Sequence, residues 1–156
     1  MRRNSSDKNY LGFILFSAFL VLLQIMGSLY TLLPTFVGVF FTYIILNFHD
    51  DKKRYYIYLS FLYLISYEFT RGFYLFSYVF TFIFFYNFFV DKIRNNFTCV
   101  NCILFIYVLF AYIGHYFINA FIAYLLNQDI SSFSNEYLYY IVIDSIISMM
   151  IFKGRV

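Results

Sequence analysis

Charged side chains are scarce in this sequence, and their scarcity excludes most soluble folds. Only 12% of the 156 residues are charged, whereas 63% are hydrophobic, and the mean hydropathy is +0.73. A soluble domain carries about 25% charged residues, which solvate its surface. Because this chain has far fewer, most of its surface is expected to face lipid. The composition predicts an integral membrane protein.

The residue patterns of most enzymes are missing as well. No stretch matches H-E-x-x-H, G-x-S-x-G or a phosphate-binding loop. We therefore assign no catalytic, cofactor-binding or metal-ligating residues, expect no cofactor, and expect the protein not to be an enzyme. No G-x-x-x-G is present, so close helix pairing of the glycophorin type has no support. Cys99 and Cys102 form a lone C-x-x-C, which is expected to serve packing rather than redox chemistry.

Long uncharged apolar runs are abundant instead. A membrane-spanning helix needs about 20 apolar residues. Six runs meet or approach this length, and they predict an all-α, six-helix transmembrane bundle that forms a single transmembrane domain over residues 1–156. The predicted helices are about 10–29, 32–49, 55–68, 72–90, 100–126 and 136–152. The first also resembles a signal peptide, but it is long for one and is expected to stay uncleaved.

The positive charges lie where a six-helix topology with both termini in the cytoplasm would place them. Cytoplasmic loops of membrane proteins are enriched in Lys and Arg. With six helices, every basic residue except Arg71 falls on the cytoplasmic side. Five helices would place one end of the chain outside and break this pattern. The basic residues therefore set orientation, and no nucleic-acid partner is expected.

Glu68 and Arg71 are the only charged residues between Arg54 and Asp91, and both lie just before Gly72. Three residues apart on a helix, their side chains share a face and can form an ion pair. In one interpretation this is a structural turn, in which the pair ends the third helix and Gly72 makes the turn. In the other it is a contact point for a partner protein. The residues alone favour neither.

Two further ionisable residues lie inside predicted helices, His115 in the fifth and Asp144 in the sixth. At 1.5 Å per residue, both lie roughly 10–15 Å below the outer surface. An ionisable group at this depth costs a few kcal/mol, so each should face the bundle interior and find a partner. We expect His115 and Asp144 to contact each other, as a polar clasp that orders the helices rather than as a proton relay. Gln24 in the first helix is expected to bond another helix.

The order of several residues adds a family resemblance. Gln24 lies near the end of the first helix, Pro34 near the start of the second, and Glu68 and Gly72 lie four residues apart at the end of the third, with Leu75 following. This set resembles the MreD family of bacterial rod-shape-determining membrane proteins, in which a Gln-containing first helix and a Pro-led second helix precede a G-x-x-x-D-x-x-x-G-x-x-L-G stretch. Gly72 and Leu75 match that stretch, Glu68 replaces its Asp, and its first and last Gly are replaced.

The resemblance implies a non-enzymatic scaffold of the cell-elongation machinery in the bacterial inner (cytoplasmic) membrane. The implied partners are MreC, the MreB filament, and the glycosyltransferase RodA with its transpeptidase, which together direct side-wall peptidoglycan synthesis and so regulate cell shape. The MreD fold is also similar to that of the six-helix substrate-binding subunits of energy-coupling-factor transporters. A substrate-binding membrane subunit of such a small-molecule transporter is therefore the alternative function.

The transporter alternative requires a polar pocket that opens outward. The predicted outer ends offer few polar groups for one, namely Thr31, Glu68, Arg71, Asn127, Gln128 and Asp129. Transporter subunits of this kind also carry alanine-rich helix faces, and this chain has few alanines. The sequence therefore favours the scaffold.

Overall fold

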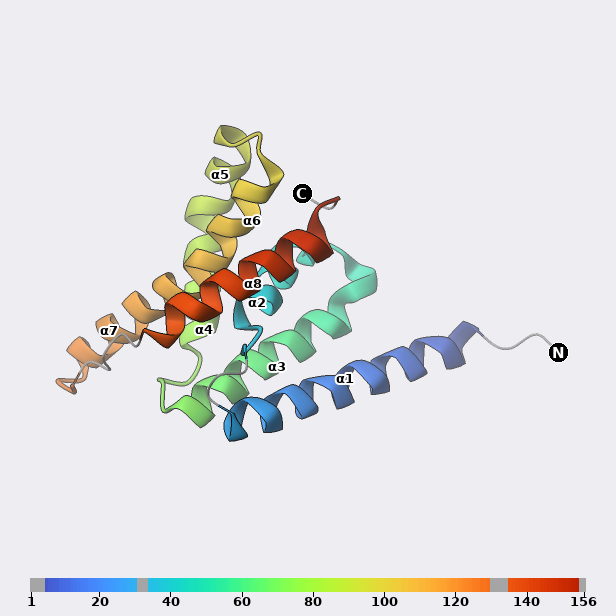
Figure 1. Ribbon diagram of the computed structural model, residues 1–156, viewed down its shortest axis with the longest axis horizontal. Helices are drawn as coiled ribbons and strands as arrows, with labels where there is room; N and C mark the ends of the chain where they lie inside the picture. Colours follow the sequence, from blue (N-terminus) through green and yellow to red (C-terminus); the bar gives the residue numbers. More distant parts are fainter. Residues whose placement is uncertain (1–4, 31–33, 130–134, 155–156) are drawn as a thin grey trace.

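The computed structural model describes residues 5–30, 34–129 and 135–154, and every regular element within these ranges is a helix (Figure 1). Three of the basic residues expected on the cytoplasmic side, Arg2, Arg3 and Arg155, lie outside the described residues, as does Thr31, which was expected at the outer end. The elements in chain order are α1 (Ser5–Leu29), α2 (Val37–Asn47), η1 (Asp51–Lys53), α3 (Arg54–Arg71), α4 (Ser77–Phe85), η2 (Tyr86–Val90), α5 (Asp91–Asn96), α6 (Val100–Leu109), η3 (Phe110–Gly114), α7 (His115–Leu125) and α8 (Glu136–Phe152).

Two of the predicted helices are interrupted by π-helical turns without being broken. The turn η2 joins α4 to α5, and η3 joins α6 to α7, with helical backbone angles at each junction. A π-helical turn inserts one extra residue per turn and shifts the side chains that follow around the helix axis. Apolar run length cannot reveal such a shift, so the faces of α5 and α7 could not be assigned from the sequence.

The starts of α2 and α4 differ from the predicted ones. The second helix was expected from residue 32 and begins at Val37, so that Pro34 precedes it. The fourth was expected from residue 72 and begins at Ser77. In both cases a phenylalanine with a left-handed backbone, Phe36 (φ 53°) or Phe76 (φ 67°), stands directly before the helix.

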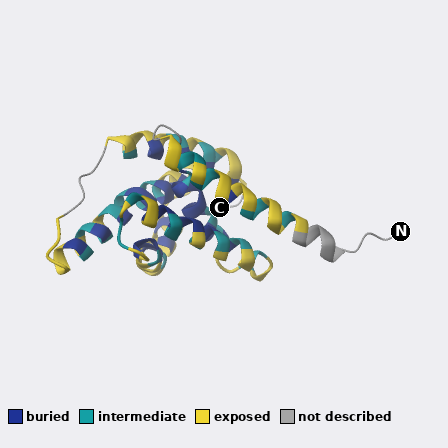
Figure 2. Cartoon of the chain, turned by 90° about the horizontal axis from the view of Figure 1, so that it is seen from below, coloured by how far each residue is buried: buried dark blue, intermediate teal, exposed yellow. Residues whose placement is uncertain are grey.

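The helix α2 is the centre of the packing, because it contacts α3, α6 and α8. Its Phe41 and Ile44 are fully buried. The helix α1 lies along the edge of the bundle and packs against α3, in the same chain direction (Figure 1). Figure 2 shows buried residues concentrated where the helices cross and exposed residues along α1 and the outer ends.

Two helical stretches are long and apolar enough to cross a membrane, Leu11–Leu29 in α1 and Val100–Leu125 in α6, η3 and α7. The first of these exposes a wide apolar face, on which Leu15, Val21 and Ile25 are each more than half exposed. Soluble proteins rarely expose contiguous apolar surfaces of this extent. The exposed face of α1 therefore requires lipid or another protein to cover it.

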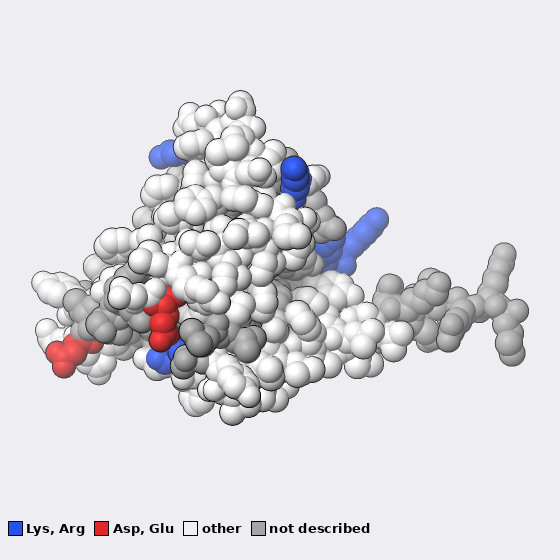
Figure 3. Space-filling view, viewed as in Figure 1, with Lys and Arg blue, Asp and Glu red and all other residues white. Residues whose placement is uncertain are grey.

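On the face that Figure 3 shows, the charged side chains lie near the ends of the molecule. Figure 3 shows Lys and Arg near the α5 end of the bundle, near η1 and near the C-terminal end of α8. The acidic side chains that are visible lie towards the opposite end, with one further basic side chain beside them, and the surface between the two ends is uncharged on this face. This distribution separates two polar ends from an apolar middle.

Candidate functional site

Glu68 is fully buried in the last turn of α3, and its carboxylate holds the start of α4. The backbone N–H of Phe76 donates to Oε2 at 2.7 Å, and the Tyr78 N–H donates to Oε1 at 2.5 Å. The Ser77 hydroxyl also donates to Oε1, at 2.6 Å. The first N–H groups of a helix have no partner within it, and the helix dipole favours a negative charge there. Glu68 is therefore an N-terminal cap supplied by a neighbouring helix.

The chain between the two helices is shaped for this contact. Gly72 ends α3 with φ 72°, a left-handed conformation that glycine adopts without strain. The Gly72 and Phe73 N–H groups both bond to the Glu68 carbonyl, which turns the chain back over its own helix end. Phe76 adopts a left-handed conformation that is unfavourable for a bulky residue. Its hydrogen bond to Glu68 helps to hold it there.

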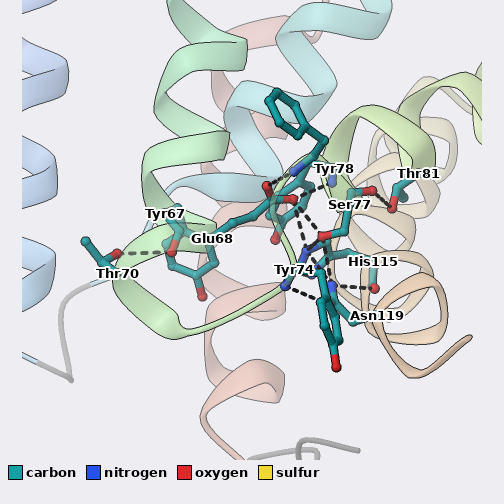
Figure 4. A network of polar contacts seen from close by, with 10 residues as sticks. Tyr67, Glu68, Thr70, Tyr74, Ser77, Tyr78, Thr81, His115 and Asn119 are labelled. Atoms are coloured by element: carbon teal, nitrogen blue, oxygen red, sulfur yellow. Dashed lines mark hydrogen bonds and ion pairs between the residues drawn. The ribbon is translucent and has the colours of Figure 1, made fainter. Parts of the chain in front are cut away.

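The helix α7 joins the same cluster through His115 and Asn119 (Figure 4). The Ser77 Oγ lies 2.7 Å from His115 Nε2, and Asn119 Nδ2 donates to Ser77 Oγ at 2.9 Å. Asn119 Oδ1 accepts from the Tyr74 N–H at 3.0 Å. We call Glu68, Ser77, His115 and Asn119 the Glu68 network. It connects α3, α4 and α7 through side chains that are all buried.

Aromatic rings close the His115 side of this network. The imidazole stacks on the Tyr78 ring, with the ring centroids 3.7 Å apart and the planes 4° apart. The Phe73 ring meets it edge-on at 5.0 Å. His115 also lies 3.6 Å from Glu68 Oε1. The histidine is thus fixed from two sides and faces the carboxylate.

Serine, histidine and glutamate are also the residue types of a hydrolase triad, but in this arrangement the serine oxygen is not accessible to a substrate. In a catalytic triad the histidine lies between the serine and the acid and leaves the serine oxygen open to substrate. Here the Ser77 hydroxyl lies between Glu68 and His115, and Ser77 has no exposed surface. A substrate carbonyl cannot approach that oxygen. The network can order its hydroxyl proton between two acceptors, and it fastens three helices.

Arg71 does not pair with Glu68 in the structure, contrary to the expectation. Glu68 turns towards α4, where its two oxygens accept from three donors. The Arg71 guanidinium instead lies over the Tyr67 ring, 6.0 Å from its centroid, beside a cavity that borders α1. Spacing on a helix placed the two residues on one side of α3 but could not show that the start of α4 would occupy the carboxylate.

The expected contact between His115 and Asp144 is also wrong. Both side chains are buried and face the bundle. Asp144 Oδ2, however, accepts from the Gly38 N–H at 2.8 Å and from the Tyr112 hydroxyl at 2.7 Å, whereas His115 belongs to the Glu68 network. Depth along a helix fixes the height of a side chain and leaves its direction open. Asp144 points from α8 towards α2, and His115 points from α7 towards α4.

The Asp144 contact repeats the arrangement found at Glu68. Gly38 is the second residue of α2, so its N–H is one of the unpaired groups at the helix start. Tyr112 gives its proton to Asp144, and the Thr35 hydroxyl, 3.1 Å away, therefore donates to the Tyr112 oxygen. The Tyr63 hydroxyl of α3 donates to the Thr35 carbonyl. This Asp144 network connects α8, α2, η3 and α3.

Gln24 bonds a neighbouring helix in the structure. Its Nε2 donates to the Ser66 carbonyl at 3.1 Å and to Thr70 Oγ1 at 2.9 Å, which fastens the outer half of α1 to α3.

Cys99 and Cys102 are both exposed and form a disulfide with each other, so they do not serve the packing expected of them.

Several residues of the two networks were missed by the sequence analysis. Ser77 precedes a long apolar run, which is a sequence signal for a helix start. Gly38 is an isolated glycine in a helical stretch, which indicates a close approach. Asn119 and Tyr112 carry no such local signal, because their place in the networks depends on the direction in which each side chain points.

The described residues contain no group of three or more His, Cys, Asp or Glu side chains that could hold a metal ion. Comparisons with protein-family models, curated proteins and solved structures found no match to this chain.

Proposed function

We propose that the chain is a multi-pass protein of the bacterial inner membrane, with six spans and both termini in the cytoplasm. Support comes from the apolar middle of the surface between two charged ends (Figure 3). It also comes from the exposed apolar face of α1, which would be costly in water. The spans would be α1, α2, α3, α4–η2–α5, α6–η3–α7 and α8. Cytoplasmic Lys52, Lys53, Lys92 and Lys153 agree with the positive-inside rule.

Within the membrane, the protein acts as a non-enzymatic scaffold of the cell-elongation machinery. This proposal is carried by one observation, namely that both buried carboxylates are bound to other helices of the same chain. Glu68 and Asp144 each cap the start of a neighbouring helix, and their hydrogen bonds fasten the bundle internally. Because these carboxylates bind helices of the same chain, they hold the outer surface of the bundle in one arrangement, as a scaffold requires.

The exposed apolar face of α1 is the surface that the scaffold offers to partners. The helix is fastened to α3 by Gln24, and the opposite face, with Leu15 and Phe19, is open. The resemblance of Gln24, Pro34, Glu68 and Gly72 to MreD supports the identity of the partners, which are MreC, the MreB filament, and RodA with its transpeptidase. The protein regulates cell shape by holding these components together.

Depletion of the protein in its native host tests this function. We expect cells to lose side-wall elongation and become wider and rounder within a few generations, and a plasmid copy to restore their shape. Normal cell width after depletion, together with loss of uptake of a small solute, would contradict the scaffold.

A specific observation favours the transporter subunit as second candidate. A cavity of about 120 Å³ lies between α1 and α3 near the predicted outer surface, and Arg71, Thr70 and Gln24 are among its lining residues. An outward pocket with a few polar groups is what a substrate-binding subunit requires. The volume suits only a small group. The scaffold and the transporter subunit would co-purify with different chains, so affinity purification distinguishes the two functions.

A further inference from the structure

The cavity between α1 and α3 has one guanidinium nitrogen without a hydrogen-bond partner on its wall. Its lining residues come from the ends of both helices and from Thr35 before α2, and they include Gln24, Gly27, Ser28, Thr70 and Arg71. Arg71 Nη2 is buried and has no hydrogen-bond partner within the described part of the chain. A buried donor without an acceptor costs about 1–3 kcal/mol, and more when it is charged. An anionic acceptor in the cavity would remove this cost.

An apolar groove adjoins the cavity on the same pair of helices. It has a volume of about 190 Å³ and shares Gln24 and Tyr63 with the cavity. Its other lining residues are mostly apolar and include Leu20, Leu59 and Leu62. Because α1 and α3 run in the same direction, the groove lies one to two turns nearer the bundle middle than the cavity. The pair therefore forms a cationic end followed by an apolar channel.

We propose that this surface binds one anionic phospholipid, with its phosphate at Arg71 and one acyl chain in the groove. A guanidinium presents paired N–H donors that match two phosphate oxygens. The hydroxyls of Ser28 and Thr70 also lie on the cavity wall, but both donate to carbonyls of their own helices, so Arg71 supplies the open donor. An apolar groove on an exposed helix suits an acyl chain better than a soluble anion, which would leave the groove empty.

The inference rests on the membrane placement proposed above and is independent of the scaffold function. In the proposed topology, Arg71 is the single basic residue on the outer side, so the bound lipid belongs to the outer leaflet. The lipid would seal the gap between α1 and α3 and so set how α1 is presented to partners.

Native mass spectrometry of the purified protein in mild detergent tests the proposal, together with its melting temperature. The added probes are phosphatidylglycerol, an uncharged diacylglycerol, and inorganic phosphate at matched ionic strength. We expect one phosphatidylglycerol to remain bound and saturating lipid to raise Tm by about 5 °C or more. A matching rise with inorganic phosphate alone would reassign the site to a soluble anion, and a matching rise with diacylglycerol would show that Arg71 plays no part; either result overturns the proposal.

Three variants locate the lipid. Arg71→Gln should weaken phosphatidylglycerol binding about tenfold, whereas Lys92→Gln, an exposed cation at the other end, should not change it. Gly27→Leu leaves Arg71 intact and fills the cavity, because a Cβ at Gly27 has no atom within 4 Å. It should abolish lipid binding while keeping the fold, so it decides the question even where Arg71→Gln does not fold. Full binding by Gly27→Leu would overturn the proposal.

Discussion

The carboxylate of Glu68 is fully buried, and its three hydrogen-bond donors all come from the start of α4. Burying an unpaired carboxylate costs several kcal/mol. The backbone N–H groups of Phe76 and Tyr78 would be equally costly without an acceptor. The carboxylate and the N–H groups therefore satisfy each other, which explains why a charge is tolerated in the middle of an apolar bundle.

Glu68→Gln should lower the free energy of unfolding by about 2 kcal/mol. The amide keeps one acceptor oxygen but places an NH₂ group against N–H donors, so that at least one charged hydrogen bond is lost. Thermal unfolding in detergent measures the effect. Asp129→Asn is the matched control, because Asp129 is exposed, and it should leave Tm unchanged. An unchanged Tm for Glu68→Gln would contradict the capping role of this carboxylate.

Gly38→Ala should be destabilising through packing alone. A Cβ at Gly38 would lie 2.7 Å from Val108 Cγ1 and 3.0 Å from Asp144 Oδ2, so α2 would have to move away from α6 and α8. Overpacking of this kind costs about 1–3 kcal/mol. The control is Gly27→Ala, where the added methyl meets open space. Equal unfolding temperatures for the two variants would show that α2 does not pack as described.

The burial of the ionisable residues His115 and Asp144 was predictable from the sequence, but their partners were not. The cost of a charge in an apolar bundle correctly directed His115 and Asp144 inward. Their partners depend on the rotation of each helix, and the π-helical turn η3 directly before His115 changes that rotation. Hydrogen bonds to backbone N–H groups, as at Gly38 and Phe76, leave no trace in side-chain identity.

At the scale of elements, the turn between α3 and α4 depends on backbone conformation rather than on contacts. Gly72 has φ 72°, and a Cβ added there would meet nothing within 4 Å. Gly72→Ala should therefore cost about 1 kcal/mol from strain alone. Gly72→Asn should cost less, because asparagine tolerates the left-handed region better than alanine does. Chemical denaturation of the three proteins would show this order, and a more stable Gly72→Ala would contradict the turn.

Helix existence was easier to predict than helix starts. The runs at residues 100–126 and 136–152 nearly coincide with α6–η3–α7 and α8, because long uncharged runs bounded by polar residues leave little choice. The predicted starts at 32 and 72 were early because apolar residues continue through the turns before α2 and α4. Those turns are set by Phe36 and Phe76, whose left-handed conformations apolar patterns do not signal.

For the whole molecule, the proposed topology predicts which loops can be reached from outside the cell. In a variant with Cys99 and Cys102 replaced by serine, Asp129→Cys should react with a membrane-impermeant maleimide in intact cells. Lys92→Cys should react only after the cells are permeabilised, since both positions are exposed and only the membrane separates them. Equal labelling of both positions in intact cells would contradict the six-span topology.

The scaffold itself is tested most directly by the chains that accompany the protein. Affinity purification of the tagged protein from its native membrane in mild detergent, followed by mass spectrometry, would identify them. The account predicts recovery of MreC, RodA or the elongation transpeptidase, with less recovered when Leu15 and Phe19 on the open face of α1 are changed to alanine. Recovery of an ATPase pair with a coupling subunit in their place would contradict the scaffold and make the protein a transporter subunit.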